Sequence, residues 1–381
     1  MSSISKKIFH IIKESRKKEN KSIFKIILEL FDYSSRLGLS PGEYFTYGLQ
    51  SKLATPSYCL DYMPNSVHFK QHLSTLNSPI REVLLDKILF KNAMQKAGIP
   101  VPGTIGYAGP NKINDLNFDL ITPSTIHQIL SSHKVTDFFV KPSKGTSGKG
   151  IFLVKYIKGN EHPFNIKDQA MNTLKFFEFL TNNCENPDHG YILFEHKICS
   201  CDTLKNISPD ASPNIRIITL RMPNGEICIT SASMRLGRKN SIVSNAGSGG
   251  MLAGIDIKNG SIVGCRTTSY IQGKLISKHP DTSAQIIGVK IPNWSGILST
   301  CKKAASAIDS MNSVGWDVLL DRSVPVIIEG NDQWCMISEQ LFGKGYLTSK
   351  NRELLAFYDL EFPKQIPKRS FANLKLAFFG S

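Results

Sequence analysis

Apolar residues recur at helical spacing in several stretches of the chain, and this spacing predicts amphipathic helices there. The clearest stretch is residues 81–97, in which Leu85, Leu89 and Ala93 share one face and Gly98 ends the helix. The same spacing predicts further helices in a basic N-terminal stretch that reaches Phe31, over residues 168–181 and over residues 294–311. Predicted helices are therefore spread over the whole chain.

Short apolar segments bounded by turn residues follow these helices, and they predict antiparallel hairpins. The hairpin signals are residues 138–140 and 151–154 about a glycine-rich loop, residues 215–222 and 227–236 about Pro223-Asn224-Gly225, and the turn Lys258-Asn259-Gly260. The sequence contains no internal repeat and no low-complexity linker. The predicted fold class is α+β, with hairpins dominating the middle and C-terminal parts.

The composition is that of an ordinary globular protein, because hydrophobic residues make up 41% and charged residues 20% of the 381 residues. No apolar run approaches the roughly 18 to 20 residues that span a bilayer. The apolar stretch within residues 1–18 is too short for a signal-peptide core, so we expect a cytoplasmic protein. The eight cysteines form no paired CxxC framework, so reduced thiols are expected.

The chain is strongly basic, with 46 lysines and arginines against 31 acidic residues and a net charge of +15. Such a balance suits an anionic partner such as a nucleotide, a polyanionic substrate or a membrane surface. Because the sequence has no zinc finger, RRM signature or basic region with heptads, nucleic acid is not expected as a partner.

Much of the basic charge lies near the N-terminus, where residues 6–25 hold eight basic and two acidic residues. The apolar residues that follow at helical spacing are Ile23, Phe24, Ile27, Leu28 and Phe31. One interpretation is a helix that packs this stripe on the body of the protein and exposes a solvated basic face. The other is a surface helix that contacts anionic lipid or an anionic polymer.

The glycine-rich loop lies in FFVKPSKGTSGKGIFLV, from Phe138 to Val154, and its glycines have the spacing GxxGxG. Glycines let backbone N–H groups approach phosphate oxygens closely, and three lysines add positive charge. A P-loop and a dinucleotide fingerprint are excluded, because their spacings differ and both open a helix, whereas a strand is predicted here. The loop is either a flap over a polyphosphate or an ordinary glycine-rich hairpin.

The acidic segment GWDVLLDRSVPVIIEGND, from Gly315 to Asp332, predicts a second hairpin. A turn centred on Ser323 places Asp317 beside Glu329, and Asn331 lies on the same face as Glu329 because the two are two residues apart. Two carboxylates directly opposite each other repel unless a cation lies between them. Two carboxylates and one amide suit Mg²⁺ or Mn²⁺, whereas the alternative is a pair of solvent-exposed strand acids.

Four other residues are weaker candidates when each is taken alone. Arg216 lies in the strand segment NIRIITLRM and faces opposite to Ile215 and Ile217, and Arg235 begins a segment rich in small residues. Each is either an anion-binding group or an ordinary surface arginine. Glu195 ends an apolar strand, where a carboxylate accepts hydrogen bonds from adenine or ribose. Lys87 lies on the predicted 81–97 helix, and its position alone predicts a solvated lysine.

Taken together, these segments resemble the ATP-grasp superfamily and, within it, the sugar-transfer-associated ATP-grasp family. The resemblance covers roughly residues 35 to 350. Its matching segments, in the family's order, are residues 36–49, 84–102, 138–151, 191–198, 212–226, 233–260, 278–294 and 315–331.

The resemblance implies a role for each candidate residue. Two lysines, Lys87 and Lys141, contact phosphates, and the 144–150 loop covers the β- and γ-phosphates of ATP through Lys144, Gly145, Thr146, Ser147, Gly148 and Gly150. At the hinge strand, Glu195 reads adenine, and Asp202 is the candidate ribose ligand. The metal-binding trio, for Mg²⁺ or Mn²⁺, is Asp317, Glu329 and Asn331, as in D-alanine–D-alanine ligase. Arg216 and Arg235 face the γ-phosphate and the acyl phosphate, and Lys141 also takes part in catalysis.

Asp332-Gln333-Trp334 replaces the family's usual Pro/Gly turn and is expected to reshape the acceptor side.

These expectations divide the chain into an N-terminal basic helical region (1–80), a linker subdomain (81–135), a lid subdomain (136–195) and a C-terminal subdomain with the metal site (196–381). The implied function is an ATP-dependent ligase that joins a carboxylate to an amine through an acyl phosphate. Its substrates are small molecules, with a surface-polysaccharide precursor, an amino acid or a peptide all open. Contact with an anionic membrane is expected through the basic N-terminus. A kinase acting on a hydroxyl and a non-catalytic nucleotide-binding module are the alternatives, and the oligomeric state is not readable from the sequence.

Overall fold

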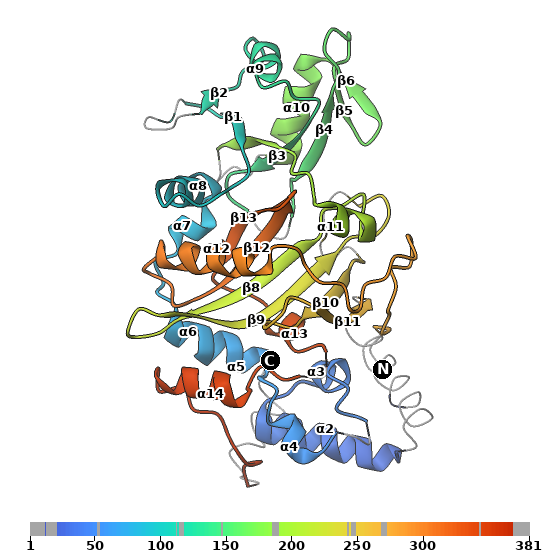
Figure 1. Cartoon of the computed structure of the whole chain (residues 1–381), viewed down its shortest axis with the longest axis vertical. Coiled ribbons are helices and arrows are strands. Elements are labelled where there is room, and N and C mark those ends of the chain that lie inside the picture. Colours follow the sequence, from blue (N-terminus) through green and yellow to red (C-terminus); the bar gives the residue numbers. More distant parts are fainter. Residues whose placement is uncertain are drawn as a thin grey trace.

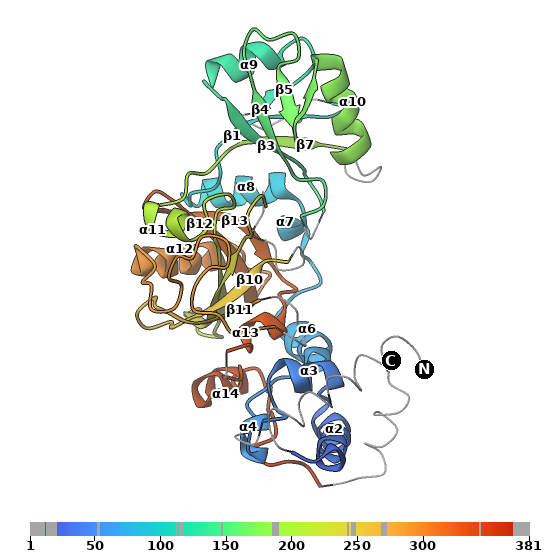
Figure 2. The same ribbon diagram turned by 90° about the vertical axis from the view of Figure 1, so that its right-hand side faces the viewer.

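The computed structural model describes residues 12, 21–51, 54–111, 113, 118–145, 148–184, 190–241, 244, 249–267, 273–342 and 344–368. Two β-sheets lie one above the other along the long axis, and a helical region forms the lower end (Figures 1 and 2). The combination of helices with largely antiparallel sheets confirms the predicted α+β class.

The upper sheet has seven strands in the order β2-β1-β7-β3-β4-β5-β6, and only the β1–β2 pair is parallel. Its strands are β1 (Thr104–Ala108), β2 (Asp119–Leu120), β3 (Asp137–Pro142), β4 (Phe152–Tyr156), β5 (Phe164–Ile166), β6 (Gln169–Met171) and β7 (Ile192–His196). Helices α9 (Ile126–Ser132) and α10 (Thr173–Cys184) pack on it and share a buried core with its strands. Within that core the rings of Phe164 and Phe176 stack 4.2 Å apart.

The lower sheet has six strands in the order β11-β10-β9-β8-β12-β13, and every neighbouring pair is antiparallel. Its strands are β8 (Asn214–Arg221), β9 (Ile227–Leu236), β10 (Met251–Ile255), β11 (Ile262–Thr267), β12 (Ser313–Asp321) and β13 (Val324–Asn331). The predicted hairpins about Pro223-Asn224-Gly225 and Lys258-Asn259-Gly260 are confirmed.

Each face of the lower sheet is covered by a different part of the chain. Helix α12 (Trp294–Ser306) packs on one face, where its Ile297 and Cys301 join the odd-numbered Ile215 and Ile217 of β8 in the largest buried core. Side chains alternate along a strand, so Arg216 and Ile218 point to the other face. That face is covered at its lower end by N-terminal and C-terminal helices, which share a core with Ile218.

The helices at the lower end are mostly short. They are α2 (Ile23–Leu37), α3 (Pro41–Thr46), α4 (Pro56–Cys59), α5 (Asn65–Val67), the π-helix η1 (His68–His72) and α6 (Leu73–Leu76), with α13 (Met336–Glu339) and α14 (Ser349–Ala356) from the C-terminal part. Helix α11 (Asp202–Ile207) lies higher and shares the core of the lower sheet with α12 (Figure 1). The capping box of α3, in which Ser40 and Glu43 exchange hydrogen bonds, is the local signal that starts that helix.

Helix α2 has apolar residues on two opposite faces. Ile26 and Tyr33 are buried in the N-terminal core. Of the five residues of the predicted stripe, Ile23 packs on this core, whereas Phe24, Ile27, Leu28 and Phe31 are between 36% and 72% exposed. The interpretation in which this stripe packs on the body of the protein therefore holds for Ile23 and is wrong for the other four residues. Most of the basic stretch before α2 lies outside the described residues.

The predicted helix over residues 81–97 is broken at Asp86, so α7 (Glu82–Leu85) and α8 (Lys87–Lys96) are separate helices. Asp86 has an extended backbone, caps α8 by accepting from the N–H of Ile88 at 2.8 Å, and forms a β-bridge with Lys144. The predicted apolar face was also wrong, because Leu85 and Leu89 are exposed. The residues of α8 that are buried are Ile88, Phe90, Lys91 and Met94.

Two other helix predictions were too long. Residues 168–171 belong to the β5–β6 hairpin, whose two-residue turn holds Lys167 and Asp168 at φ 49° and 65°, so α10 begins only at Thr173. Helix α12 ends at Ser306, five residues before Met311, which instead forms a β-bridge with Asn77.

The expected division at residue 135 runs through the upper sheet, because β1 and β2 precede it and β1 pairs with β7. All eight cysteines lie at described positions and all are free thiols, as expected. In the part of the chain that the structure describes, no helix combines the length and the hydropathy required to cross a bilayer.

Candidate active site

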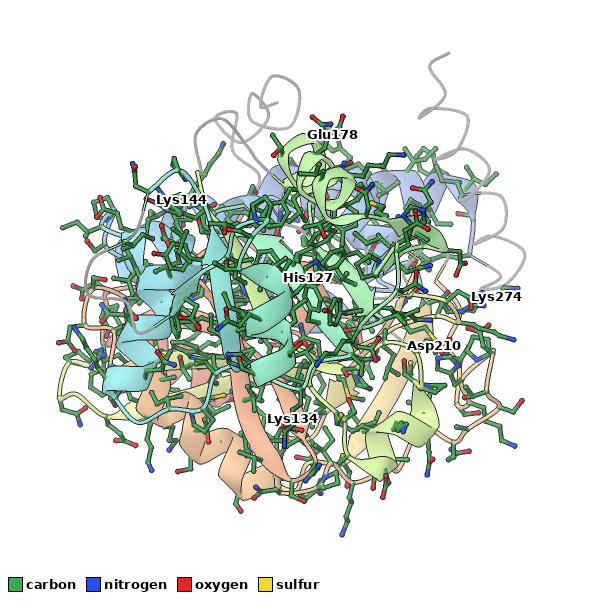
Figure 3. The ribbon with its side chains drawn as sticks, turned by 90° about the horizontal axis from the view of Figure 1, so that it is seen from above. His127, Lys134, Lys144, Glu178, Asp210 and Lys274 are labelled. Carbon is green, nitrogen blue, oxygen red and sulfur yellow. The ribbon has the colours of Figure 1, made fainter. Side chains whose placement is uncertain are left out.

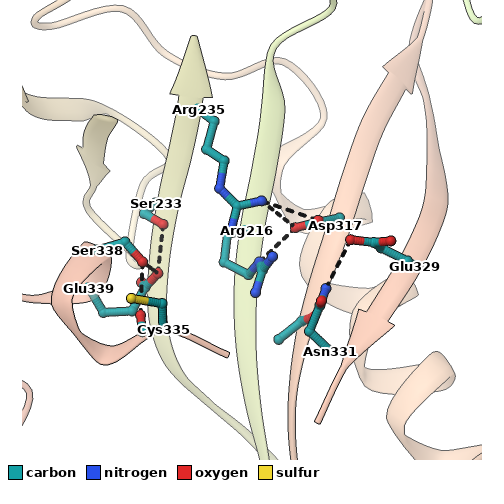
Figure 4. Close-up of polar contacts among 10 residues, drawn as sticks. Arg216, Ser233, Arg235, Asp317, Glu329, Asn331, Cys335, Ser338 and Glu339 are labelled. Carbon is teal, nitrogen blue, oxygen red and sulfur yellow. Dashed lines mark hydrogen bonds and ion pairs between the residues drawn. The ribbon is translucent and has the colours of Figure 1, made fainter. Parts of the chain in front are cut away.

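One row of paired residues crosses four strands of the lower sheet, on the face opposite α12. Glu329 of β13 pairs with Asp317 of β12, Asp317 pairs with Arg216 of β8, and Arg216 pairs with Ser233 of β9. Directly paired residues point to the same face with their Cβ atoms about 5 Å apart. Arg235 lies on this face too, since it is two residues beyond Ser233 on β9. The sheet therefore lines up two acids and two arginines side by side (Figure 4).

The predicted pairing of Asp317 with Glu329 is confirmed, but the turn differs from the prediction. Asp321 pairs with Val324, so the turn contains only Arg322 and Ser323, and Arg322 has a positive φ of 55°. A shift of register at Val318 then moves the pairing by one residue. The bulged residue is Ile328, which lets Asp317 and Glu329 meet and turns both carboxylates toward the same face.

Asp317 is buried and contacts both arginines. Its Oδ1 accepts from Arg216 Nε at 2.6 Å, and its Oδ2 lies 3.2 Å from Arg235 Nη1. Burial alone raises the pKa of Asp317, but the two guanidinium groups outweigh it and hold this pKa well below its usual range. Asp317 is thus ionised, and it fixes both guanidinium groups on the sheet face.

Glu329 lies on the other side of Asp317, and no ion pair among the described residues joins it to an arginine. Burial and the neighbouring Asp317 carboxylate raise the pKa of Glu329. Nδ2 of Asn331 donates to Glu329 Oε1 at 3.3 Å, which confirms that the two share a face. A second carboxylate forced against an ionised one needs a proton or a cation, and the oxygen donors here are those that Mg²⁺ takes. The residues therefore fit a divalent cation, which would neutralise Glu329.

The upper sheet contributes a buried cluster of two lysines and one glutamate. Glu195 of β7 places one carboxylate oxygen 2.6 Å from Lys91 Nζ and the other 2.7 Å from Lys141 Nζ. All three side chains are at most 6% exposed. Burial by itself raises the pKa of Glu195, but Lys141 and Lys91 outweigh it and lower this pKa. Lys91 was not predicted from the sequence, where it reads as one more lysine of a helix.

Lys91 is held by oxygen atoms on three sides. Its Nζ also donates to the Pro102 carbonyl at 2.7 Å and to Thr104 Oγ1 at 2.6 Å. Burial lowers the pKa of Lys91 to about 8, while Glu195 acts in the opposite direction. The carboxylate of Glu195 thereby retains a cationic neighbour that is independent of Lys141.

The glycine-rich loop is attached at its first residues to the break between α7 and α8. The N–H of Lys87 donates to the Ser143 carbonyl at 2.8 Å, and Lys87 Nζ donates to the Gly145 carbonyl at 3.1 Å. Gly145, Gly148 and Gly150 all have positive φ values, of 127°, 74° and 73°, which only glycine adopts freely. Thr146 and Ser147 lie outside the described residues.

The two sheets bring their charged residues together at Lys87. Burial and the positive charge of Lys141 lower the pKa of Lys87 to about 8, while Glu329 and Glu195 act in the opposite direction. Lys87 in turn partly offsets the rise in the pKa of Glu329. Lys87 is therefore a half-buried lysine between the upper cluster and the acidic pair, and not the solvated lysine that its position alone suggests.

Two predicted residues lie at the margins of this site. Asp202 is the exposed first residue of α11. Lys144 is exposed too, and in the view from above in Figure 3 it lies toward the edge of the projection, to one side of His127, although its backbone pairs with Asp86 at the start of α8.

The chain belongs to the sugar-transfer associated ATP-grasp family, whose model matches residues 70–354. No curated protein sequence matches it.

Among solved structures, the chain is similar to a biotin carboxylase from Campylobacter jejuni (15% identity, 76% of this chain and 49% of that chain, TM-score 0.44). It is also similar to the biotin carboxylase domain of the Hydrogenobacter thermophilus 2-oxoglutarate carboxylase (15% identity, 71% of this chain and 47% of that chain, TM-score 0.37). A third similar structure is the D-alanine–D-alanine ligase from Coxiella burnetii (12% identity, 78% of this chain and 64% of that chain, TM-score 0.40). The chain spans about half the length of the two biotin carboxylase structures.

Proposed function

We propose that this protein is an ATP-dependent carboxylate–amine ligase that forms an amide through an acyl phosphate. The observation that carries the proposal is the row Glu329–Asp317–Arg216, in which two neighbouring carboxylates lie directly beside a pair of arginines. We propose that the two carboxylates hold a divalent cation. Membership of an ATP-grasp family supports the use of ATP. The finer identification as a ligase comes from the chemistry that this row suits.

In this proposal ATP lies between the two sheets. Lys87 and Lys141 bind its phosphates, and the loop from Lys144 to Gly150 covers them. Glu195 and Asp202 contact the adenosine part. When bound, Mg²⁺ held by Asp317, Glu329 and Asn331 supplies charge neutralisation on the phosphates.

The chain's own residues then act mainly by position and charge. The γ-phosphoryl group passes to a substrate carboxylate oxygen and ADP is released, and Lys141 offsets the negative charge that spreads over the transferring group. Arg216 and Arg235 bind the acyl phosphate, and Arg235, which is the less buried of the two, stabilises the oxyanion that forms when an amine attacks. The amine nitrogen bonds to the carbonyl carbon, the bond from that carbon to the phosphate oxygen breaks, and phosphate leaves.

Glu195 contributes in a second way, because it is the direct partner of Lys141. With one oxygen on Lys141 and the other on Lys91, it holds the Lys141 ammonium in one place before phosphate binds. When Lys141 turns to the phosphate, Lys91 remains, so Glu195 is not left as an unpaired buried charge.

The substrates that we propose are a small carboxylic acid and an amine. The family's description, sugar-transfer associated, supports a sugar-containing substrate. We propose a sugar acid of a surface-polysaccharide precursor, and an amino acid or peptide fits the same chemistry. Contact of the N-terminal region with an anionic membrane is a separate proposal, supported by the exposed apolar stripe of α2 beside the basic stretch.

The test is an incubation with Mg-ATP, hydroxylamine and a panel of amino acids and uronic acids, followed by assays of ADP, phosphate and hydroxamate. Hydroxylamine traps an acyl phosphate whatever the natural amine is. We expect hydroxamate and ADP in equal amounts from the correct acid, and neither from the Glu329→Gln variant. ADP together with a stable phosphoester and no hydroxamate would identify a kinase. Tight ATP binding without turnover would identify a non-catalytic module.

A further inference from the structure

A carboxylate that forms no ion pair within the part of the chain that the structure describes lies on the same face of the lower sheet as Arg216 and Arg235, beyond the two arginines. It belongs to Glu339, the last residue of α13. Its Oε2 accepts from Ser231 Oγ at 2.6 Å, and its Oε1 accepts from Ser233 Oγ at 2.8 Å and from Ser338 Oγ at 3.3 Å. Its known partners are therefore neutral hydroxyl groups.

Among the ion pairs of the described residues, none joins Glu339 to a lysine, arginine or histidine. Burial raises the pKa of Glu339, and the serine hydroxyls and the charges of Arg216 and Arg235 only partly oppose it. An ionised carboxylate accepts about four hydrogen bonds, and a buried one is costly unless a cation accompanies it. Glu339 as a whole residue is half-buried, so part of it remains in contact with solvent.

The position of Glu339 relates it directly to the proposed reaction. Ser233, which donates to Glu339, pairs with Arg216 across β8 and β9. Glu339 is thus the next charged group along the row after the arginines. Figure 4 shows Glu339 on one side of Arg216 and Arg235, with Asp317 and Glu329 on the other. A group bound at Glu339 lies beside whatever the arginines hold, on the side away from the cation site.

The segment between Asn331 and α13 keeps Glu339 in place. Trp334 is buried, its indole N–H donates to Ser313 Oγ at 3.1 Å, and its carbonyl lies 2.7 Å from His68 Nε2. Arg81 pairs with Asp332 at 3.0 Å. The segment Asp332-Gln333-Trp334, which replaces the family's Pro/Gly turn, therefore anchors α13 against the N-terminal helices. This anchoring gives the Glu339 carboxylate a fixed position.

We propose that Glu339, together with Ser231 and Ser233, binds the protonated amine of the acceptor substrate. This inference rests on the ligase function proposed above, and it adds the place and the charge of the amine. A primary ammonium group that becomes an amide nitrogen loses two protons. One passes to Glu339 before the nitrogen attacks the carbonyl carbon, and the second passes to the phosphate that leaves as the bond between the carbonyl carbon and the phosphate oxygen breaks. Glu339 then returns its proton to water. A carboxylate whose pKa is raised is suited to accept such a proton.

The test compares a neutral and a cationic nucleophile on the same acyl phosphate. Hydroxylamine is largely uncharged at neutral pH, whereas methylammonium is a cation. With the acid that yields hydroxamate, methylammonium chloride should suppress hydroxamate formation by the wild type, because it occupies the amine site whether or not it reacts. We compare Glu339→Gln with the wild type, each relative to its own rate of hydroxamate formation without methylammonium. The methylammonium concentration for half suppression should rise by at least about tenfold, as for the loss of one charged hydrogen bond.

The matched control is Glu353→Gln on the exposed side of α14, with potassium chloride in place of methylammonium as the salt control. Both should behave as the wild type. Hydroxamate formation by Glu339→Gln also reports that the variant is folded. Equal suppression in the wild type and in Glu339→Gln overturns the proposal, as does a wild type that methylammonium does not suppress, or a loss of hydroxamate itself in Glu339→Gln. A wild type that makes no hydroxamate from any acid removes the ligase function first, and this inference with it.

Discussion

Nε of Arg216 lies 2.6 Å from Oδ1 of Asp317, its direct neighbour across β8 and β12. Asp317 has Glu329 on its other side. One carboxylate therefore serves both the proposed cation site and the proposed phosphate-binding arginines. This relationship makes Asp317 the residue on which stability and chemistry depend together.

Replacing Asp317 by asparagine should cost about 3–5 kcal/mol in the free energy of unfolding, because the buried Arg216 would lose its charged partner. The same variant should lose ADP release, since both the cation site and the arginines are disturbed. Urea unfolding and an ADP assay measure the two effects. Asp309→Asn is the matched control, because the Asp309 side chain is 92% exposed and its ion pair with Arg221 is long, at 3.5 Å. Unchanged stability of Asp317→Asn would contradict the buried ion pair.

Lys91→Met should weaken ATP use without abolishing it. Glu195 would retain only Lys141, so its pKa should rise toward the ordinary value. Glu195 would then be protonated at a higher pH, and Lys141 would lose its partner there. We expect a KM for ATP raised by about tenfold, in line with the loss of a charged hydrogen bond, and an acid limb of the pH–rate profile moved to higher pH.

The control for this change is Lys96→Met, an exposed lysine at the end of the same helix. It should leave both the KM and the pH profile unchanged. A wild-type pH profile in Lys91→Met would show that Lys91 has no influence on Glu195.

The sequence predicted the parts of this site that depend on local pairing. Hairpin geometry was enough to place Asp317 beside Glu329, although the agreement depends on the bulge at Ile328, which offsets a turn shorter than expected. The alternation of side chains along a strand was enough to place Asn331 with Glu329. These relationships span few residues, so pattern alone predicts them.

The sequence could not predict contacts that are made only when distant segments fold together. Lys91 meets Glu195 across more than 100 residues, and no local pattern marks either as the other's partner. Glu339 lies on a four-residue helix with no periodic signal, and its serines belong to β9. The break at Asp86 was missed because Asp86 and Lys87 fit a continuous helical pattern, whereas the bridge to Lys144 depends on the glycine-rich loop.

Acid should destabilise the protein through two buried histidines. His68 and His72 contact each other through their Nδ1 atoms at 2.8 Å, and burial lowers the pKa of His68 to about 4 and that of His72 well below its ordinary value. Below pH about 6.5 the unfolded chain binds protons that the folded protein excludes, so stability falls as the pH falls.

The expected slope from this pair is up to about 1.4 kcal/mol per pH unit for each histidine between pH 6 and 5. Urea unfolding at a series of pH values measures it. His72→Phe should lower the free energy of unfolding at pH 7 and reduce by about one the number of protons that unfolding takes up in acid. The exposed His162→Gln should change neither quantity. An acid slope that is the same in His72→Phe and in the wild type would count against the pair.

The exposed stripe on α2 predicts binding to anionic vesicles. Phe24→Ser combined with Leu28→Ser removes two side chains that are 72% and 45% exposed, so the fold should be kept. Sedimentation with phosphatidylserine vesicles should weaken by at least about tenfold, because these groups would otherwise leave water for the bilayer interface. Phe357→Ser, which alters an exposed phenylalanine after α14, is the control. Equal sedimentation of the double variant and the wild type would exclude this surface as a lipid contact.

The most direct test of the proposed chemistry follows one oxygen atom. The acid that yields hydroxamate is labelled with ¹⁸O in its carboxylate and incubated with Mg-ATP and an amine, and the released phosphate is examined by mass spectrometry. An acyl phosphate requires that one carboxylate oxygen leave with the phosphate. We predict one ¹⁸O atom per phosphate in the wild type and no turnover in Glu329→Gln. Phosphate without ¹⁸O, released together with ADP, would contradict carboxylate activation by this protein.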